Sequence, residues 1–204
     1  ELIHNGFDQK IYLPKKRFKR KNFNLKNNQI IIGNVARFHK VKNHKYLLSI
    51  FEKIKNISNI KLVLIGTGLD TNNIILMKMI NNYKLQNKVI LLGKRNDVFH
   101  IYKLFDIFML TSLSEGFPNV LAEAMINKNI CFSTKVGDSS LILNDNKFII
   151  PKHNVEKSAQ ILKRFILKRN NTKWKMIKEK NKKNIIKNFS LKKMVSKYSN
   201  VWNS

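Results

Sequence analysis

Residues 107–125 read IFMLTSLSEGFPNVLAEAM, and this stretch decides how the rest of the chain is interpreted. Its first five residues form a short run that is apolar on both faces, which is typical of a strand buried in a parallel sheet. A tight turn through residues 114–116 follows, and Pro118 suits the first position of a helix, where no N–H donor is needed. A helical pattern then covers residues 118–128. The stretch predicts a strand, a loop and a helix, the repeating unit of an α/β fold.

The same unit recurs on both sides of this stretch. Further apolar runs predict strands at residues 30–36, 61–65, 88–92, 129–133 and 147–150. Amphipathic patterns predict helices at residues 43–57, 72–84, 97–104 and 154–169, then terminal helices near 172–188 and 190–202. We therefore expect a Rossmann-like open parallel sheet flanked by helices, with the terminal helices packed on it. We expect one domain over residues 1–204, made of an N-terminal segment with a basic loop (1–28), an α/β core (29–170) and C-terminal helices (171–204).

The charge of the chain is strongly positive and uneven. Its 204 residues carry 40 Lys and Arg against 12 Asp and Glu, a net charge of +28. Residues 10–26 hold +8 of this excess and residues 151–204 hold +14. An anionic partner would explain it, whether nucleic acid, a phosphorylated ligand or an acidic membrane. The Lys-, Asn- and Ile-rich profile of an A+T-rich genome explains it equally well, and the small number of Arg residues counts against base-specific recognition of nucleic acid.

Composition also bounds the compartment and the redox chemistry. The single cysteine, Cys131, excludes an intramolecular disulfide and a multi-cysteine metal site, and its apolar surroundings predict a buried structural thiol. No apolar run approaches the ~20 residues of a membrane span, and no signal-peptide pattern opens the chain. We expect a cytoplasmic protein, soluble or peripheral on the inner face of the cytoplasmic membrane. The chain begins Glu-Leu-Ile-His-Asn without Met, as the tail of a longer protein would.

Ligands of such sheets bind at the carboxyl ends of the strands, so the loops there carry the candidate residues. After the first predicted strand come Arg37 and Lys42, two cations that could converge on one phosphate group. His39 and His44 in the same loop are expected to be solvated.

The next two loops give weaker signals. The second predicted strand ends in Gly66-Thr67-Gly68, which permits close backbone approach but lacks the third glycine of a dinucleotide fingerprint. After the third predicted strand, Asp97 is expected to cap the following helix.

The loop after the fourth predicted strand is the most informative. Backbone N–H groups at the start of the helix near Pro118 would be free to receive an anion, helped by the helix dipole. Glu115 in the loop and Glu123 in the helix are placed to contact different parts of one extended ligand. Glu123 lies among Leu, Ala and Met residues, where an unpartnered carboxylate would be costly, so we expect a hydrogen-bond donor beside it.

The motif EGFPNVLAEAM, with Glu115 and Glu123 in an E-x7-E arrangement, resembles the signature of the family four retaining glycosyltransferases of GT-B architecture. Other segments match this family in the same order: NGFD (5–8), ARFHKVKNH (36–44), GTGLDTNN (66–73), VILLGKRNDV (89–98), LFDI (104–107) and TKVGDS (134–139). The combination is similar to the branch that assembles bacterial capsule, lipopolysaccharide and exopolysaccharide. The resemblance spans residues 3–202 and implies the C-terminal, donor-binding half of a GT-B enzyme.

The resemblance also implies roles for individual residues. Arg37 and Lys42 would bind the donor diphosphate and stabilise its charge as it leaves, and Glu115 would contact the donor sugar, making these three the catalytic candidates. Glu123 would bind the ribose, the start of the following helix would bind the phosphates and sugar, and the loop of Lys94 and Arg95 would hold the base through backbone contacts. The donor-binding candidates are therefore Glu123, Gly116, Phe117, Asn119, Val120, Lys94, Arg95, Gly66 and Gly68. The donor would be a UDP-sugar, with a GDP-sugar as the alternative, and no metal would be obligatory.

Two departures from the family pattern stand out. Ala36 replaces the usual glycine before the arginine, a mild change. The N-terminal domain that supplies the acceptor site and a catalytic histidine has no counterpart here, so this chain alone is expected to lack transferase turnover without that partner in cis or trans.

Two rival functions stay open. A non-catalytic basic module that binds nucleic acid or anionic membrane would explain the charge but not the two glutamates, and nucleic acid is the weaker partner. A phosphorylase-like or epimerase relative of the same architecture would share the Arg, Lys and Glu placements. The aromatic residues Trp174, Phe189, Tyr198 and Trp202 stand among lysines, where packing of the terminal helices onto the sheet is favoured over a membrane contact.

Overall fold

The computed structural model describes residues 2–8, 10–11 and 18–203, so residues 12–17 of the predicted basic segment lie outside it. Six parallel strands form one sheet in the order β3-β2-β1-β4-β5-β6. Their bounds are β1(Ile30–Val35), β2(Ile60–Ile65), β3(Val89–Leu91), β4(Ile107–Leu110), β5(Ile130–Thr134) and β6(Ile149–Ile150). All six strands were predicted, because buried parallel strands are short apolar runs that stand out in the sequence.

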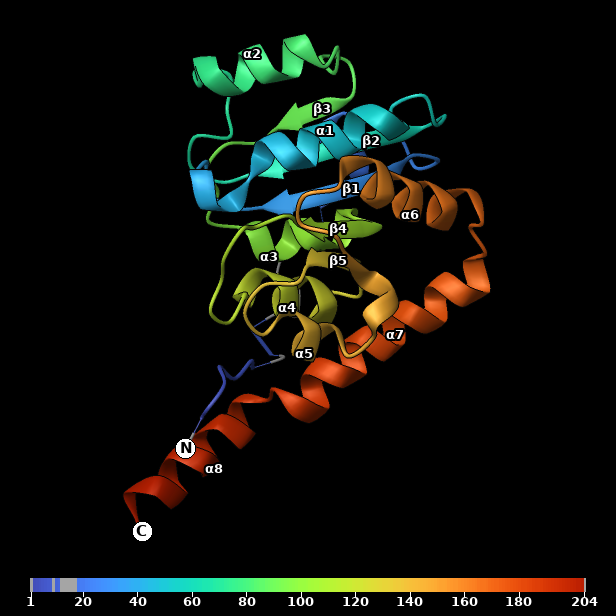
Figure 1. Ribbon diagram of the computed structural model, residues 1–204. Coiled ribbons are helices and arrows are strands. Elements are labelled where there is room, and N and C mark those ends of the chain that lie inside the picture. Colours follow the sequence, from blue (N-terminus) through green and yellow to red (C-terminus); the bar gives the residue numbers. More distant parts are fainter. Residues whose placement is uncertain (1, 9, 12–17, 204) are drawn as a thin grey trace.

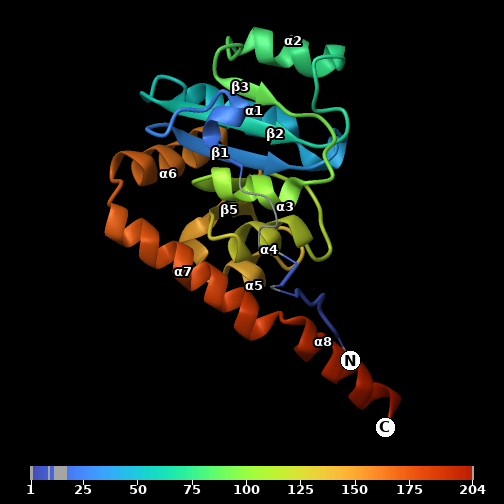
Figure 2. The same cartoon turned by 180° about the vertical axis from the view of Figure 1, so that it is seen from behind.

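Helices cover both faces of the sheet (Figure 1). They are α1(His44–Ile54), α2(Ile74–Asn82), α3(Val98–Ile101), α4(Asn119–Ile126), α5(Ser139–Leu143), α6(Val155–Leu167), α7(Asn171–Asn188) and α8(Leu191–Trp202). On one face α1 packs against α2 and α6, and on the other α4 packs against α5 and α7. Figure 2 shows the second face, with α3 in front of the sheet. The expected α/β fold with a Rossmann-like open sheet is confirmed.

The predicted helix bounds need several corrections. The helix expected over 97–104 is α3 followed by a 3-10 turn at Tyr102–Leu104. The short helix α5 was missed, because five residues are too few to show a helical period. Pro118 is the N-cap of α4 rather than its first residue, since its ψ of 86° is not helical.

The core of the sheet consists of fully buried aliphatic and aromatic side chains, among them Ile31, Leu62 and Phe108. Cys131 is also fully buried, as predicted, and burial raises the pKa of its thiol well above the ordinary value. This thiol therefore stays protonated and packs as a small apolar group.

Arg20 ties the N-terminal segment to the amino ends of β1 and β4. Its guanidinium donates to the carbonyls of Asn27, Gln29 and Leu104 and, over 2.8 Å, to the carboxylate of Asp106. The same carboxylate oxygen accepts from the backbone N–H of Ile31. Asp106 thus has a structural role at the end of the sheet opposite the loops that were expected to bind the ligand.

The two terminal helices differ in how they pack. α7 contacts α4, α5 and β5, and Trp174 and Phe189 at its two ends are buried as expected. α8 buries no side chain, and Tyr198 and Trp202 are exposed, so the prediction that both helices pack on the sheet is wrong for α8. Figure 1 shows α8 extending away from the sheet, next to the N-terminus. No helix among the described residues combines the length and hydropathy that a membrane span needs.

Candidate functional site

The direction in which the chain adds strands to the sheet reverses between β1 and β4. The chain proceeds from β1 towards β3 on one side and from β4 towards β6 on the other, so the loops that follow these two strands diverge. Ligands of open α/β sheets bind at such a switch point, outside the carboxyl ends of the strands. The loop 36–43 follows β1 and the loop 111–118 follows β4, as the sequence predicted.

An ion pair joins these two loops. The ammonium of Lys42 lies 2.6 Å from Oε1 of Glu115, and the hydroxyl of Ser112 donates to the same oxygen over 2.6 Å. The side chains of Lys42 and Glu115 are only 22% and 13% exposed, so water screens the pair weakly. A backbone hydrogen bond from Leu113 to Val41 holds the loops together. The sequence nominated both charged residues but did not predict that they pair.

Arg37 stands apart from this pair. It is exposed and forms no hydrogen bond or ion pair with any other residue that the structure describes.

The loop that carries Arg37 crosses directly over Gly66, where φ is 145° and a Cβ atom would lie 1.9 Å from the carbonyl oxygen of Ala36. Hydrogen bonds from Ala36 to Ile65 and from Phe38 to Thr67 fix the crossing. The close approach that Gly66 permits is therefore to the chain itself, and ligand contacts of Gly66 and Gly68 stay a prediction.

The start of α4 offers backbone donors. Within the described part of the chain, the N–H groups of Gly116, Phe117, Asn119 and Val120 have no hydrogen-bond acceptor. The loop that carries them is anchored from its other side, because the N–H of Asp138 donates to the carbonyl of Gly116 over 3.0 Å. The sequence predicted free N–H groups at this helix start, and their binding of an anion, which the helix dipole would favour, stays a prediction.

The N-terminal segment supports this loop, a contact that the sequence did not reveal. The side-chain amide of Asn5 donates to Oδ1 of Asn119 over 2.9 Å. The ring of Phe117 lies among the rings of His4, Phe7 and Phe189, at centroid distances of 5.8, 6.1 and 5.5 Å. The side chains of Phe117 and Asn119 thus have structural contacts, and ligand binding by their backbone N–H groups stays a prediction.

Glu123 has the hydrogen-bond donor that the sequence predicted. The hydroxyl of Tyr102, a fully buried residue, donates to Oε2 of Glu123 over 2.9 Å. Burial raises the pKa of Glu123 above its ordinary value, and the hydrogen bond from Tyr102 offsets part of this rise. Tyr102 itself was not nominated, because a tyrosine in a short helical segment carries no local signal of a polar partner.

Lys94 and Arg95 lie in the loop after β3. Lys94 is exposed, whereas Arg95 donates through two nitrogens to the carboxylate of Asp97, each over 2.7 Å, and lies 5.5 Å from the ring centroid of Phe23. Asp97 occupies the N-cap position of α3 but its side chain makes no capping hydrogen bond, so that prediction was right in place and wrong in mechanism. The guanidinium beside it lowers the pKa of Asp97.

The expectation that His44 is solvated is wrong. Its side chain is 3% exposed, and neither ring nitrogen has a hydrogen-bond partner among the residues that the structure describes. Burial, together with the nearby charge of Lys42, lowers its pKa to about 4, so the ring is neutral at pH 7. It lies 5.5 Å from the ring of Phe38 and fills space beneath the loop. His39 is exposed, as expected, and accepts from the N–H of Val41.

Residues 15–184 match the family model described as glycosyl transferases group 1. The chain belongs to this family. The resemblance drawn from the E-x7-E motif and the ordered loop segments is thereby confirmed, and so is the assignment of the fold to the C-terminal half of GT-B enzymes.

Two curated relatives show how far the similarity extends. N-acetyl-alpha-D-glucosaminyl L-malate synthase of Bacillus anthracis is 24% identical over 99% of this chain and 53% of its own length. UDP-Gal:alpha-D-GlcNAc-diphosphoundecaprenol alpha-1,3-galactosyltransferase of Escherichia coli is 28% identical over 98% of this chain and 53% of its own length. The chain spans about half the length of the curated relatives it matches.

A solved structure shows the same fold. Anabaena Alr3699/HepE, in complex with UDP and glucose, superposes with a TM-score of 0.84 at 20% identity. The match covers the whole of this chain and 56% of that one.

Proposed function

We propose that this chain is the donor-binding half of a retaining glycosyltransferase and binds a nucleoside diphosphate sugar at the carboxyl ends of β1 and β4. One observation carries the proposal: Arg37, the Lys42–Glu115 pair and the amides at the start of α4 gather at one switch point. In the part of the chain that the structure describes, Arg37 has no ion-pair partner and these amides have no acceptor. Each of these suits a different part of an extended anionic ligand.

Arg37, Lys42 and the free amides would bind the diphosphate. An ammonium has three donors, so Lys42 can contact a phosphate oxygen while it keeps its 2.6 Å contact with Glu115. Cations fixed beside the bridging oxygen stabilise the negative charge that develops when the nucleoside diphosphate leaves. With these cations in place we expect no obligatory metal, which activity unchanged by a chelator would support.

Glu115 and Glu123 would position the two ends of the donor. Glu115 would accept from a hydroxyl of a hexose-type sugar, and Glu123 would accept from the ribose through the oxygen that Tyr102 does not occupy. The loop of Lys94 and Arg95 would hold the base, and because Asp97 already engages Arg95, the base would meet mainly backbone groups there. A UDP-sugar is the first expectation and a GDP-sugar the second. The Escherichia coli relative is named for a UDP-galactose donor, and the Anabaena structure holds UDP, which supports uridine.

The acceptor would be a lipid-linked glycan of a bacterial surface polysaccharide, used at the cytoplasmic face of the membrane. Its site would lie on a further domain, since the matched relatives are about twice as long as this chain. We propose that α8 contacts that domain, because Val195, Tyr198 and Trp202 lie exposed along a helix that buries nothing. Transfer by this chain alone is not expected.

The test is thermal stabilisation of the chain by UDP, GDP and ADP at two salt concentrations, with pyrophosphate and short single-stranded DNA as controls. A ligand that binds only the folded state raises stability by RT ln(1 + [L]/Kd). Selectivity for one nucleoside diphosphate that survives high salt would support a donor site and identify the base. Equal stabilisation by every polyanion, lost at high salt, would remove the donor site in favour of a basic module that binds anions by charge alone.

A further inference from the structure

The turn that joins α6 to α7 carries an unusual concentration of positive charge. Residues 161–177 contain six Lys and Arg and no Asp or Glu. Every residue from Leu167 to Lys173 is exposed, and Leu167 itself is 63% exposed. Figures 1 and 2 both show this turn at the outer edge of the molecule, at the opposite end of α7 from α8. We name residues 161–177 the α6–α7 corner.

A hollow of about 290 Å³ opens between the two helices of the corner. Its floor is aromatic: Phe165 and Trp174 stack with centroids 5.3 Å apart and planes 15° from parallel, and Phe148 lies 5.9 Å from Phe165. Four cations surround this floor, namely Lys147, Arg164, Lys168 and Lys173, and no acidic side chain lines the hollow. A fifth cation, Arg169, lies 5.1 Å above the ring of Trp174.

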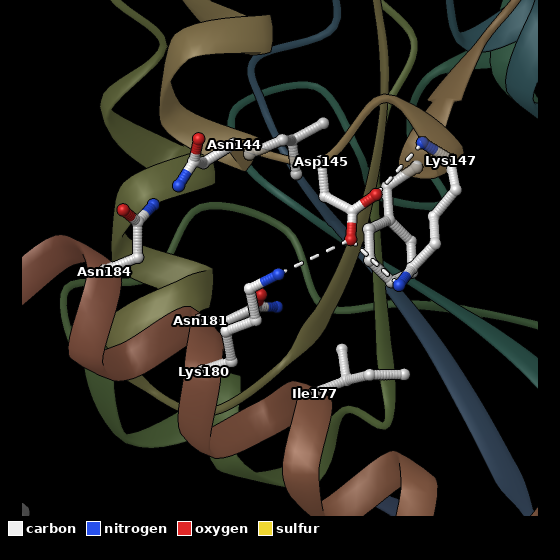
Figure 3. Close-up of a pocket in the computed structure, with 9 residues that line it drawn as sticks. Asn144, Asp145, Lys147, Ile177, Lys180, Asn181 and Asn184 are labelled. Atoms are coloured by element: carbon white, nitrogen blue, oxygen red, sulfur yellow. Dashed lines mark hydrogen bonds and ion pairs between the residues drawn. The ribbon is translucent and has the colours of Figure 1, made fainter.

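The carboxylate of Asp145 pairs with Lys147 but with no other cation that lines the hollow. Figure 3 shows Asp145 turned towards its own ion pairs, 2.8 Å from Lys147 and 3.7 Å from Lys180. The space beside it measures about 20 Å³, room for a single water rather than for a ligand. Asn181 and Asn184 fix α7 to the core there, through hydrogen bonds to the carbonyls of Asn129 and Ile142. α7 is therefore held firmly to the core, and Arg164, Lys168 and Lys173 have no acidic partner among the residues that the structure describes.

We propose that the α6–α7 corner is a docking surface for an anionic phospholipid bilayer. Arg164, Lys168 and Lys173 contact lipid phosphates, and the aromatic hollow takes up the apolar part of a lipid next to its headgroup. Lys and Arg near an anionic leaflet attract it additively. Nucleic acid fits the corner less well, because its bases stack on open aromatic faces whereas Trp174 is only 5% exposed, and because exposed Leu167 suits an acyl chain rather than a phosphate. This inference extends the proposed function by naming the surface through which the enzyme reaches a lipid-linked acceptor.

The chain carries its own reporter for the test. Its two tryptophans are Trp174 in the hollow and Trp202, which is 84% exposed on α8, so Trp202→Phe leaves Trp174 as the single tryptophan. Vesicles of phosphatidylglycerol mixed with phosphatidylcholine are compared with vesicles of phosphatidylcholine alone. Binding is measured by co-sedimentation, and the depth of Trp174 by quenching with lipids brominated on their acyl chains. We expect binding to the anionic vesicles and quenching of Trp174.

The decisive comparison is between two triple variants of equal charge. Arg164→Gln, Lys168→Gln and Lys173→Gln together should weaken partition onto anionic vesicles about 100-fold, since each basic residue contributes ~1 kcal/mol. The control variant removes three exposed lysines from the region of α1 and α2, through Lys45→Gln, Lys78→Gln and Lys84→Gln. It should weaken partition onto anionic vesicles far less.

Three results would overturn the proposal. The first is an equal loss of vesicle binding in the two triple variants, and the second is that brominated lipids do not quench Trp174. The third is that the corner variant loses DNA binding but still binds anionic vesicles. Nucleotide stabilisation is measured on the same variants and should match the parent chain. Failure of the donor site and failure of the membrane surface are then seen separately.

Discussion

Replacing Glu123 by glutamine separates two consequences of the burial of this carboxylate. Glutamine has nearly the same shape, and its amide oxygen can still accept from the hydroxyl of Tyr102, which lies 2.9 Å from Oε2 in the parent chain. The substitution therefore removes the charge and keeps the hydrogen bond. We expect the variant to fold more stably and to bind the donor nucleotide less tightly.

The stability effect follows from the raised pKa of Glu123. Between the ordinary pKa and the raised one, the native chain binds more protons than the unfolded chain, so the free energy of unfolding falls as the pH rises through this range. Glu123→Gln does not titrate and escapes this loss. At pH 8 it should exceed the parent by about 1–3 kcal/mol, the cost of an incompletely satisfied buried polar group. For a chain of this size that is about 2–4 °C in Tm for each kcal/mol. The advantage should shrink towards pH 4.

The binding effect follows from the loss of a charged acceptor. A hydrogen bond to a charged group contributes ~1.5–3 kcal/mol and a neutral one ~0.5–1.5 kcal/mol. Glu123→Gln should therefore raise the Kd for a nucleoside diphosphate roughly 5- to 15-fold, and Glu123→Ala roughly 10- to 150-fold.

Thermal unfolding from pH 4 to pH 8 and calorimetric titration with the preferred nucleoside diphosphate measure the two effects. Glu156→Gln is the matched control, since that glutamate is 65% exposed and contacts Lys53 on the surface. If the Tm of Glu123→Gln lies below that of the parent at pH 8, the burial of the charged carboxylate does not destabilise the parent and the reasoning is refuted. An unchanged Kd in Glu123→Ala would refute the ribose contact.

Four further substitutions test other parts of the site. Arg37→Ala should weaken binding of a nucleoside diphosphate roughly 10-fold or more and leave nucleoside binding unchanged; equal loss for both ligands in calorimetry would indicate a folding defect instead. The pKa of about 4 for His44 means that the parent loses roughly 3 kcal/mol of stability as the pH falls from 6.5 to 4. The Tm of His44→Phe should therefore rise relative to that of the parent over this range, and parallel plots of Tm against pH would contradict this. Gly66→Ala should lower the free energy of unfolding in urea by at least ~2 kcal/mol, because its Cβ would meet the carbonyl of Ala36 at 1.9 Å. Gly116→Ala should be nearly neutral, since no described atom lies within 4 Å of its Cβ. Equal losses of stability in the two variants would argue against the crossing of the loop over Gly66.

The side chains around the candidate site were predicted unevenly, and the pattern has a physical reason. Glu123 was predicted to need a donor, because a carboxylate among Leu, Ala and Met residues is costly. Its donor, Tyr102, lies 21 residues earlier and has no local sign of that role. His44 was judged from its polar neighbours in the loop, whereas burial is decided by what the fold places over it. Local sequence states what a side chain requires and not which distant group meets the requirement.

The sequence alone determined the strand, loop and helix alternation, the parallel sheet and the family. Each of these depends on residues close together in the chain: apolar runs, helical periods and the E-x7-E motif. Only the tertiary structure decided that Lys42 pairs with Glu115, 73 residues away, and that Asn5 meets Asn119, 114 residues away. It also decided that α8 stays exposed while α7 packs, and that cations gather around an aromatic hollow at the α6–α7 corner. Such contacts follow from the order of strands in the sheet and from the path of the terminal helices, which bring together side chains that share no local pattern.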